Sequence, residues 1–309
     1  MALAKEFYPS GVEGKKRARN VLLTTVDKPQ FTVTFTLRDV STDVWGSKKA
    51  AYGVEGRGYN EHDFDVLEVY CFIQGLDYDR VVLNDLLPAE LRAQSEHAEL
   101  FIIPNGINIM AKNPRAADEI FAAFVETRFD THVINHKRHC NRLAQQVCKL
   151  VDGKQQDPVD GIGSTHDMRH FANGHITTIK HTLADLLAMP ELLDETSECN
   201  LYTNTTLEPD KSGVGWHEDK ESKRVCAGRC GASMNLSFQW VQYYEPVGER
   251  FCVTLHHGCL YFMSLKAVGP GPKPSQLCLK HAAGGPAWSI SNKEWLTKRA
   301  KAKLKRTTK

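Results

Sequence analysis

A histidine and an aspartate two residues apart, His217 and Asp219, have the types and spacing best suited to chemistry in this 309-residue chain. They end a short run with strand character, and residues i and i+2 of an extended segment point to the same face. One imidazole and one carboxylate could therefore reach the same ion. A further histidine from a later strand would complete a two-His-one-carboxylate triad, which holds Fe(II) by one face and leaves positions open for substrate and O2.

The third ligand has three candidates in the C-terminal part of the chain. His256 and His257 precede Gly258 and a hydrophobic run, a pattern that favours a tight turn leading into a buried strand. His281 instead follows a predicted strand over residues 276–279 and precedes a turn of small residues. We therefore take His281 as the distal ligand, and expect it to be catalytic and metal-binding together with the first two residues.

From Cys199 onward, short strand-like runs alternate with turns. Several short strands at even spacing are typical of a β-sandwich or jelly roll. The expected strands cover residues 200–202, 214–216, 233–240, 251–255, 259–264, 276–279 and 288–291. The candidate ligands therefore belong to a β-structured core.

The preceding two thirds of the chain mix strand and helix patterns. Alternation with period two predicts strands over residues 30–37 and 66–73, and a cap-type residue before a proline predicts a short helix over 84–91. Apolar residues at helical spacing predict a long helical stretch over 113–152, broken near 128–130. A polar loop to about residue 165 and a helix over 176–189 should follow.

The last third of the chain resembles the AlkB-type dioxygenases, including the FTO branch. The run from Cys199 to Asn204 looks like the Asn-rich strand of that family, and Gly215-Trp-His-Glu-Asp-Lys-Glu221 looks like its Trp/Leu-His-x-Asp-x-Glu/Asp motif. The run from Leu255 to Met263 resembles the family's Leu-x-x-Gly-Asp-hydrophobic-Met strand, most of all its FTO version. His281 then falls where the family's second iron-binding histidine stands.

The resemblance implies a fold and a reaction. Such enzymes hold Fe(II) and 2-oxoglutarate in a double-stranded β-helix and use O2 to hydroxylate a C–H bond; a hydroxylated N-methyl group on a nucleobase is then lost. The metal does the difficult step, while the protein supplies ligation, orientation and exclusion of water. Members that act on bases take the nucleotide out of its stack.

The resemblance also implies roles for residues around the triad. Asn204 matches an asparagine that helps hold the keto acid, and Glu221 matches an acidic residue near the substrate base. Trp216 and Arg224 are further candidates for contact with substrate, Arg224 by steering a phosphate.

One departure from the family concerns the keto acid. The family closes with Arg-x-x-x-x-x-Arg, and the first arginine binds the distal carboxylate of 2-oxoglutarate, for which its forked guanidinium is well suited. Residues 287–293 here read Ala-Trp-Ser-Ile-Ser-Asn-Lys, so that arginine is missing and Lys293 stands at the second position. Lys293, or a basic residue on another strand such as Arg250, could take its place; alternatively, the co-substrate differs or the site is degenerate.

Together these patterns predict an α+β protein: a double-stranded β-helix (jelly roll) buttressed by helices, with an N-terminal mixed α/β extension. The expected division is an extension over 1–112, a helical buttress over 113–195, the catalytic core over 196–293 and a basic tail over 294–309.

Composition limits the cellular setting. No run of 18 apolar residues and no apolar signal core is visible, so we expect an intracellular protein, nuclear or cytoplasmic, without a membrane span. The nine cysteines form no repeated CxxC pattern and are expected to be mostly reduced thiols. The net charge is +2, but the tail over 294–309 is strongly basic. Such a tail is typical of a segment that contacts nucleic acid or serves as a nuclear address, and equally of a solvated chain end.

The expected function is an Fe(II)-dependent dioxygenase that uses O2 and 2-oxoglutarate on a methylated nucleobase in RNA or DNA. One alternative keeps the fold and reaction but acts on a protein or a small molecule. The other is a non-catalytic nucleic-acid-binding protein on a degenerate oxygenase fold, for which the missing arginine is the main argument.

Overall fold

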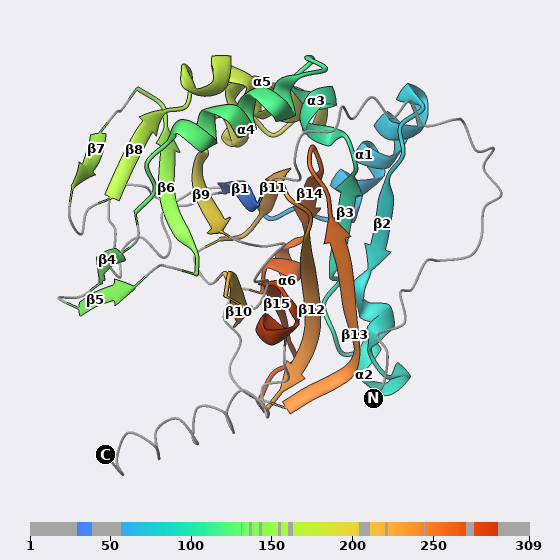
Figure 1. Ribbon diagram of the computed structural model, residues 1–309. Coiled ribbons are helices and arrows are strands. Elements are labelled where there is room, and N and C mark those ends of the chain that lie inside the picture. Colours follow the sequence, from blue (N-terminus) through green and yellow to red (C-terminus); the bar gives the residue numbers. More distant parts are fainter. Residues whose placement is uncertain are drawn as a thin grey trace, which may run out of the picture.

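Two largely antiparallel β-sheets pack face to face, and helices cover the other side of the larger sheet (Figure 1). This computed structural model describes residues 30–38, 57–130, 132–135, 138–141, 144–153, 156–159, 163–203, 211–219, 222–243, 245–269 and 275–289. Within these residues the chain is a mixed α/β protein.

The strands of the large sheet lie in the order β2 (Asp79–Val82), β3 (Glu99–Ile103), β14 (Leu260–Met263), β11 (Val225–Gly231), β1 (Phe31–Arg38), β9 (Thr196–Thr203), β6 (Gln146–Val151), β8 (Gly163–Asp167) and β7 (Gln156–Val159). The small sheet has the order β10 (Gly213–His217), β15 (Cys278–Gly284), β12 (Met234–Gln242) and β13 (Glu245–Leu255). A separate hairpin pairs β4 (His132–Asn135) with β5 (Arg138–Asn141). The α-helices are α1 (Glu61–Gln74), α2 (Ala89–Arg92), α3 (Gly106–Met110), α4 (Ala116–Glu126), α5 (His175–Leu187) and α6 (Leu265–Val268). Short 3-10 helices are η2 (Leu83–Leu86), η3 (Phe171–Gly174), η4 (Pro190–Asp194) and η5 (Pro286–Trp288).

Strand β1 lies at the centre of the large sheet, antiparallel to β11 on one side and β9 on the other. Its alternating sequence explains this position, because successive side chains of a strand point to opposite faces. Val33 and Phe35 are fully buried in the core shared with the helices, whereas Thr34 points towards the small sheet. Phe35 lies opposite Gly228, where a Cβ atom would come within 2.2 Å of its ring. The strand predicted over 30–37 is therefore confirmed.

A second hydrophobic core fills the space between the two sheets. The small sheet contributes Phe238, Trp240 and Leu279, and the large sheet contributes Tyr202 and Tyr261 among others. The indole of Trp240 donates a hydrogen bond of 2.8 Å to a backbone carbonyl of η2. Burial of each such side chain contributes about 1.5–3 kcal/mol, so this core fixes one sheet against the other.

The strand predicted over 66–73 is wrong, because these residues belong to α1. Asn60 and Asp63 form a reciprocal capping box at the start of this helix, and Gly75 ends it in the left-handed conformation. Phe64, Leu67 and Cys71 form its buried face. Val69, Phe72 and Ile73 lie exposed on the helix, and these apolar residues produced the strand-like pattern.

The long helix predicted over 113–152 is only partly correct. Helix α4 ends at Glu126, and the chain then forms β4, β5 and β6. Strand β6 pairs with β9, and β8 joins it in parallel, so the expected polar loop before residue 165 also contains strands. The buttress is therefore not helical throughout. The helix predicted over 176–189 is confirmed as α5, and the segment 84–91 contains two short helices instead of one.

The expected strands of the C-terminal part are found as β9, β10, β12, β13 and β14, with β15 beginning two residues later than predicted. Reasoning from sequence missed β11. For the last expected strand, 288–291, Trp288 belongs to η5 and residues 290–291 lie outside the described part of the chain.

Strands from different segments of the expected division lie in the same sheet. The large sheet joins β1 and β3 from the N-terminal extension, β6 from the buttress, and β9, β11 and β14 from the expected core. The basic tail, 294–309, lies outside the described residues. Among the described residues, no helix is long and apolar enough to cross a membrane.

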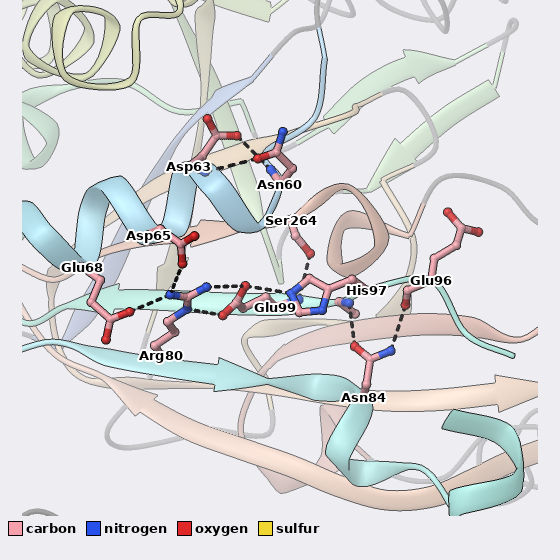
Figure 2. Close-up of polar contacts among 11 residues, drawn as sticks. Asn60, Asp63, Asp65, Glu68, Arg80, Asn84, Glu96, His97, Glu99 and Ser264 are labelled. Carbon is pink, nitrogen blue, oxygen red and sulfur yellow. Dashed lines mark hydrogen bonds and ion pairs between the residues drawn. The ribbon is translucent and has the colours of Figure 1, made fainter. Parts of the chain in front are cut away.

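A network of charges joins α1 to the edge strands of the large sheet, as Figure 2 shows. Arg80 of β2 binds Asp65 at 2.7 Å and Glu68 at 2.6 Å, both on α1, and also binds the fully buried Glu99 of β3. The backbone N–H of Glu99 donates to the hydroxyl of Ser264 at 2.8 Å. Because Ser264 is the residue before α6, the network also places that short helix.

Candidate metal centre

His217, Asp219 and His281 converge at the small sheet, although 62 residues separate the last two in sequence. One ligand atom from each lies within 4.8 Å of the others. The three side chains therefore form a group that could hold a metal ion.

Strand pairing brings the two histidines together. His217 is the last residue of β10 and lies directly opposite His281 of β15, beyond a local irregularity in the register after Val214. Side chains directly opposite in an antiparallel pair share a face. Their ring centroids are 4.2 Å apart. On β15, Leu279 and Ala283 share the face of His281 and belong to the core between the sheets, so His281 faces the large sheet.

Asp219 follows β10 and is fixed through its backbone by α6. Its N–H donates to the carbonyl of Val268 at 3.1 Å, and its own carbonyl accepts from Ser222 at 3.1 Å. Helix α6 is held in turn by Ser264, which receives the N–H of Glu99. The charge network of Figure 2 and the carboxylate of Asp219 are thus connected through one short helix.

The separations between ligand atoms suit an ion. Nε2 of His217 is 3.5 Å from Oδ1 of Asp219, and Nε2 of His281 is 3.7 Å from Oδ2 of Asp219. Two ligands about 2.1 Å from one ion and at right angles to each other are about 3 Å apart. The two nitrogen–oxygen separations exceed this by about 0.5 and 0.7 Å, so the three side chains would close inward by at least about that much on one metal. Two imidazoles with one carboxylate match the donor set of a facial triad.

Hydrogen bonding and burial prepare both rings for ligation. Nδ1 of His217 is 2.8 Å from the carbonyl of Gly215, so Nδ1 carries the proton and Nε2 presents its lone pair. Burial, with a smaller contribution from His217, lowers the pKa of His281 to about 3 against the opposing effects of Asp219 and the Ala267 backbone. The first effect fixes the tautomer of His217 that presents Nε2, and the second favours the neutral imidazole of His281, the form that binds metal.

Trp216 and Arg250 lie on the other face of the small sheet. The guanidinium carbon of Arg250 is 5.3 Å from the centre of the Trp216 ring. Arg250 is opposite Gln239, the neighbour of Phe238, and Phe238 is opposite His281. Since alternate residues of a strand point to opposite faces, Arg250 points away from His281 and does not replace the missing arginine.

Arg224 lies in the core instead of at a surface where it could steer phosphate. Its side chain is fully buried, and its guanidinium donates to the carboxylate of Glu195 and to the carbonyl of Arg57. The expectation that Arg224 meets the substrate is therefore corrected: it supports the fold around the site. Asn204, Glu221 and Lys293 lie outside the described residues.

The predicted turn at His256 and His257 is present between β13 and β14. Nδ1 of His257 accepts a hydrogen bond from the N–H of Gly231, and Nδ1 of His256 is 2.7 Å from the hydroxyl of Ser233. Their roles as turn residues leave His281 as the distal member of the triad.

Reasoning from sequence did not identify a line of polar side chains that faces the small sheet from the large one. Arg229, Thr34 and Asn200 lie opposite one another across β11, β1 and β9, and all three are buried. We call these three residues the polar row. The polar positions of the alternating runs were the available signal, but the pairing of β1 with β11 was needed to join them.

Comparison with known proteins finds a distant relative but no matching family model. An uncharacterized protein of Acanthamoeba polyphaga mimivirus is 26% identical over 255 residues, which cover 82% of this chain and 95% of the viral protein. The similarity therefore extends well beyond the last third of the chain.

Proposed function

We propose that the protein is an Fe(II)-dependent dioxygenase that uses 2-oxoglutarate to hydroxylate or oxidatively demethylate a methylated nucleobase in RNA or DNA. The observation that carries the proposal is the approach of His217, Asp219 and His281 to within 4.8 Å of one another. This donor set leaves several positions of an iron ion free for ligands, as a facial triad requires.

The arrangement of strands supports a double-stranded β-helix. From β9 to β15, successive strands fall in the large, small, large, small, small, large and small sheets. An eight-stranded jelly roll built from two Greek keys needs one more strand in the large sheet. Strand β1 supplies it from the N-terminal side of the sequence, since it lies between β9 and β11.

The residues of the chain have defined tasks in this proposal. Bound iron would activate O2 with the keto acid, which is chemistry that the side chains do not supply. Gly215 orients His217 through its Nδ1, and Val268 fixes the backbone of Asp219. The ring of Phe238, 6.1 Å from that of His281, shields one side of the site from water.

The resemblance to AlkB-type dioxygenases supports the choice of a nucleobase. It rests on the runs that contain Asn200, His217 and Gly258, and these runs fall on β9, β10 and the turn before β14. The basic residues of 294–309 agree with a nucleic-acid substrate, because Lys and Arg attract the phosphate backbone.

The test follows co-substrate and substrate separately. Protein with Fe(II) is first mixed anaerobically with 2-oxoglutarate, and the metal-to-ligand absorption band is recorded; O2 and methylated oligonucleotides are then added, and succinate and base products are measured. We expect the band, and succinate formation that methylated oligonucleotides stimulate. Asp219→Ala should lose both. Asp85→Ala, which removes an exposed surface carboxylate paired with Arg92, should retain both.

Other results would select the alternatives. Succinate formation without stimulation by any methylated oligonucleotide would point to a protein or small-molecule hydroxylase. Absence of succinate together with salt-sensitive binding of nucleic acid would indicate a non-catalytic binding protein. Either result would contradict the proposed substrate, and the second would also contradict the reaction.

A further inference from the structure

We propose that Arg229 binds a carboxylate of the organic ligand that occupies the metal centre, in place of the arginine missing from residues 287–293. This inference rests on the proposed function, because it assumes that a ligand reaches both the metal and the large sheet.

The position of Arg229 is set by strand register. It lies opposite Thr34, and Thr34 lies opposite Asn200, so the polar row crosses three neighbouring strands on one face. That face is the inner one: on β11, Val225 and Ala227 alternate with Arg229 at spacing two and belong to the core between the sheets. His281 faces the same space from the small sheet.

Arg229 is a buried cation with incomplete compensation. Its side chain is 1% exposed, and one guanidinium nitrogen, NH1, donates to the hydroxyl of Thr34 at 2.5 Å. Nε has no hydrogen-bond partner, and among the described residues no carboxylate lies within ion-pair distance of the guanidinium. Buried charges are normally paired, so this arrangement points to an anionic partner that the described residues do not supply.

Arg224, the residue before β11, provides a contrast to Arg229. It is equally buried, but the buried carboxylate of Glu195 balances its charge. The chain therefore contains one buried arginine with an internal counterion and one, Arg229, without a counterion among the described residues.

The polar row has a second atom without a partner. Oδ1 of Asn200 is buried and makes no hydrogen bond, two strands away from Arg229. A single ordered water could satisfy one such atom. Because Oδ1 itself accepts hydrogen bonds, an oxygen of an anionic ligand would be met by the Nδ2 donors of the same amide, and a ligand lying along Thr34 would then engage both ends of the row.

Tyr261 links the polar row to the metal centre. Burial raises the pKa of its phenol to about 12; Arg229 opposes this rise and Asp219 adds to it. The phenol is therefore within electrostatic range of both Arg229 and Asp219. Tyr261 also lies opposite Ala227, two residues from Arg229 on the same face. The polar row and the metal centre therefore border the same space between the two sheets, where one ligand would contact both.

Charge balance identifies the class of ligand as a small dicarboxylate. A divalent ion bound by one aspartate and two neutral histidines retains one positive charge, and Arg229 adds another. A dianion with one carboxylate at each end neutralises both, and the guanidinium edge that contains Nε suits a carboxylate. A keto group beside the first carboxylate would let that end chelate the metal.

The test compares two keto acids that differ at one end. Mn(II)-loaded protein is titrated calorimetrically, without O2, with 2-oxoglutarate and with 2-oxopentanoate, which has a methyl group where 2-oxoglutarate has its distal carboxylate. Wild type should bind 2-oxoglutarate about 10–100-fold more tightly, as expected for a charge-assisted contact. Arg229→Gln should lose this preference but keep its affinity for Mn(II) and for 2-oxopentanoate. Arg115→Gln, which removes an exposed arginine just before α4, should keep the preference.

A second variant guards against misfolding of Arg229→Gln. Asn200→Asp changes the shape of the polar row very little but adds an internal carboxylate. It should reduce the preference for 2-oxoglutarate about tenfold or more while circular dichroism and Mn(II) affinity stay unchanged.

The inference and the proposed function fail in different ways. Equal affinity of wild type for the two keto acids, with normal Mn(II) binding, would overturn the role of Arg229 and leave the metal centre intact. Retention of the preference in folded Arg229→Gln and in Asn200→Asp would overturn it too. Lack of Mn(II) binding would contradict the proposed function. In that case, thermal unfolding of the metal-free protein with glutarate would test the carboxylate site by itself. Glutarate should raise the unfolding temperature of wild type but not that of Arg229→Gln.

Discussion

At the scale of single residues, the triad depends on differences between similar side chains. The chain has 13 histidines, and among those that the structure describes, His217 and His281 are the pair whose Nε2 atoms both face the Asp219 carboxylate. One ring is oriented by a backbone carbonyl and the other is kept neutral mainly by burial. The spacing of His217 and Asp219 was readable from sequence, whereas the neutral state of His281 depends on its surroundings.

The cysteines give a residue-scale prediction. Burial raises the pKa of Cys71 to about 11 and those of Cys259 and Cys278 to about 12, so these thiols stay protonated at neutral pH. Cys252 is exposed. Iodoacetamide at about pH 8 should therefore modify Cys252 in the folded protein and spare the buried cysteines, as mass spectrometry of peptides would show.

Unfolding supplies the control for this experiment. In concentrated guanidinium chloride all of the cysteines should react. Rapid modification of Cys226 or Cys230 without denaturant would contradict their burial in β11.

At the scale of elements, a hydrophobic pattern in the sequence predicted a helix or strand correctly where the apolar positions of the pattern are the buried positions of the element. The alternation in 30–37 and the apolar spacing in 176–189 predicted β1 and α5 because each element is buried on the sides that its pattern indicates. Helix α1 was misread because the exposed Val69, Phe72 and Ile73 hid its buried face. The capping pair Asn60 and Asp63 was the signal that would have identified the helix.

The charge network of Figure 2 gives an element-scale prediction. Arg80→Ala should destabilise the protein by roughly 3 kcal/mol, because it leaves the buried carboxylate of Glu99 with the imidazole of His97 but without its arginine. Urea unfolding followed by circular dichroism measures this change. Arg115→Ala breaks an exposed i,i+4 pair with Glu119 and should cost less than about 1 kcal/mol. Equal effects of the two substitutions would show that the network does not hold α1 against β2 and β3.

At the scale of the whole molecule, contacts between distant parts of the sequence determine the fold. Strand β1 separates β9 from β11, and β3 covers the edge of β14. Alternation in a sequence identifies a strand but not its neighbours, so the central place of β1 and the polar row it completes were not predictable. The small sheet was easier, because β12 and β13 form a hairpin of neighbouring strands.

This arrangement predicts that the expected core does not fold alone. A fragment of residues 196–293 lacks β1 and β3, which leaves β9, β11 and β14 with unpaired edges prone to aggregation. It should be insoluble or unfolded, whereas a fragment of residues 30–293 retains all of these strands. A soluble 196–293 fragment with a cooperative thermal transition would contradict the central role of β1.

The whole account depends on three distant side chains that bind one metal ion. The most direct measurement is a titration of metal-free protein with Mn(II), in which electron paramagnetic resonance detects the unbound ion. Wild type should bind one ion per chain. The variant His170→Ala, which removes an exposed histidine between β8 and η3, should bind the ion equally well. Asp219→Ala and His281→Ala should weaken binding at least about 100-fold, since each removes a ligand. Binding by Asp219→Ala as tight as that of wild type, or no binding by wild type, would contradict the metal centre.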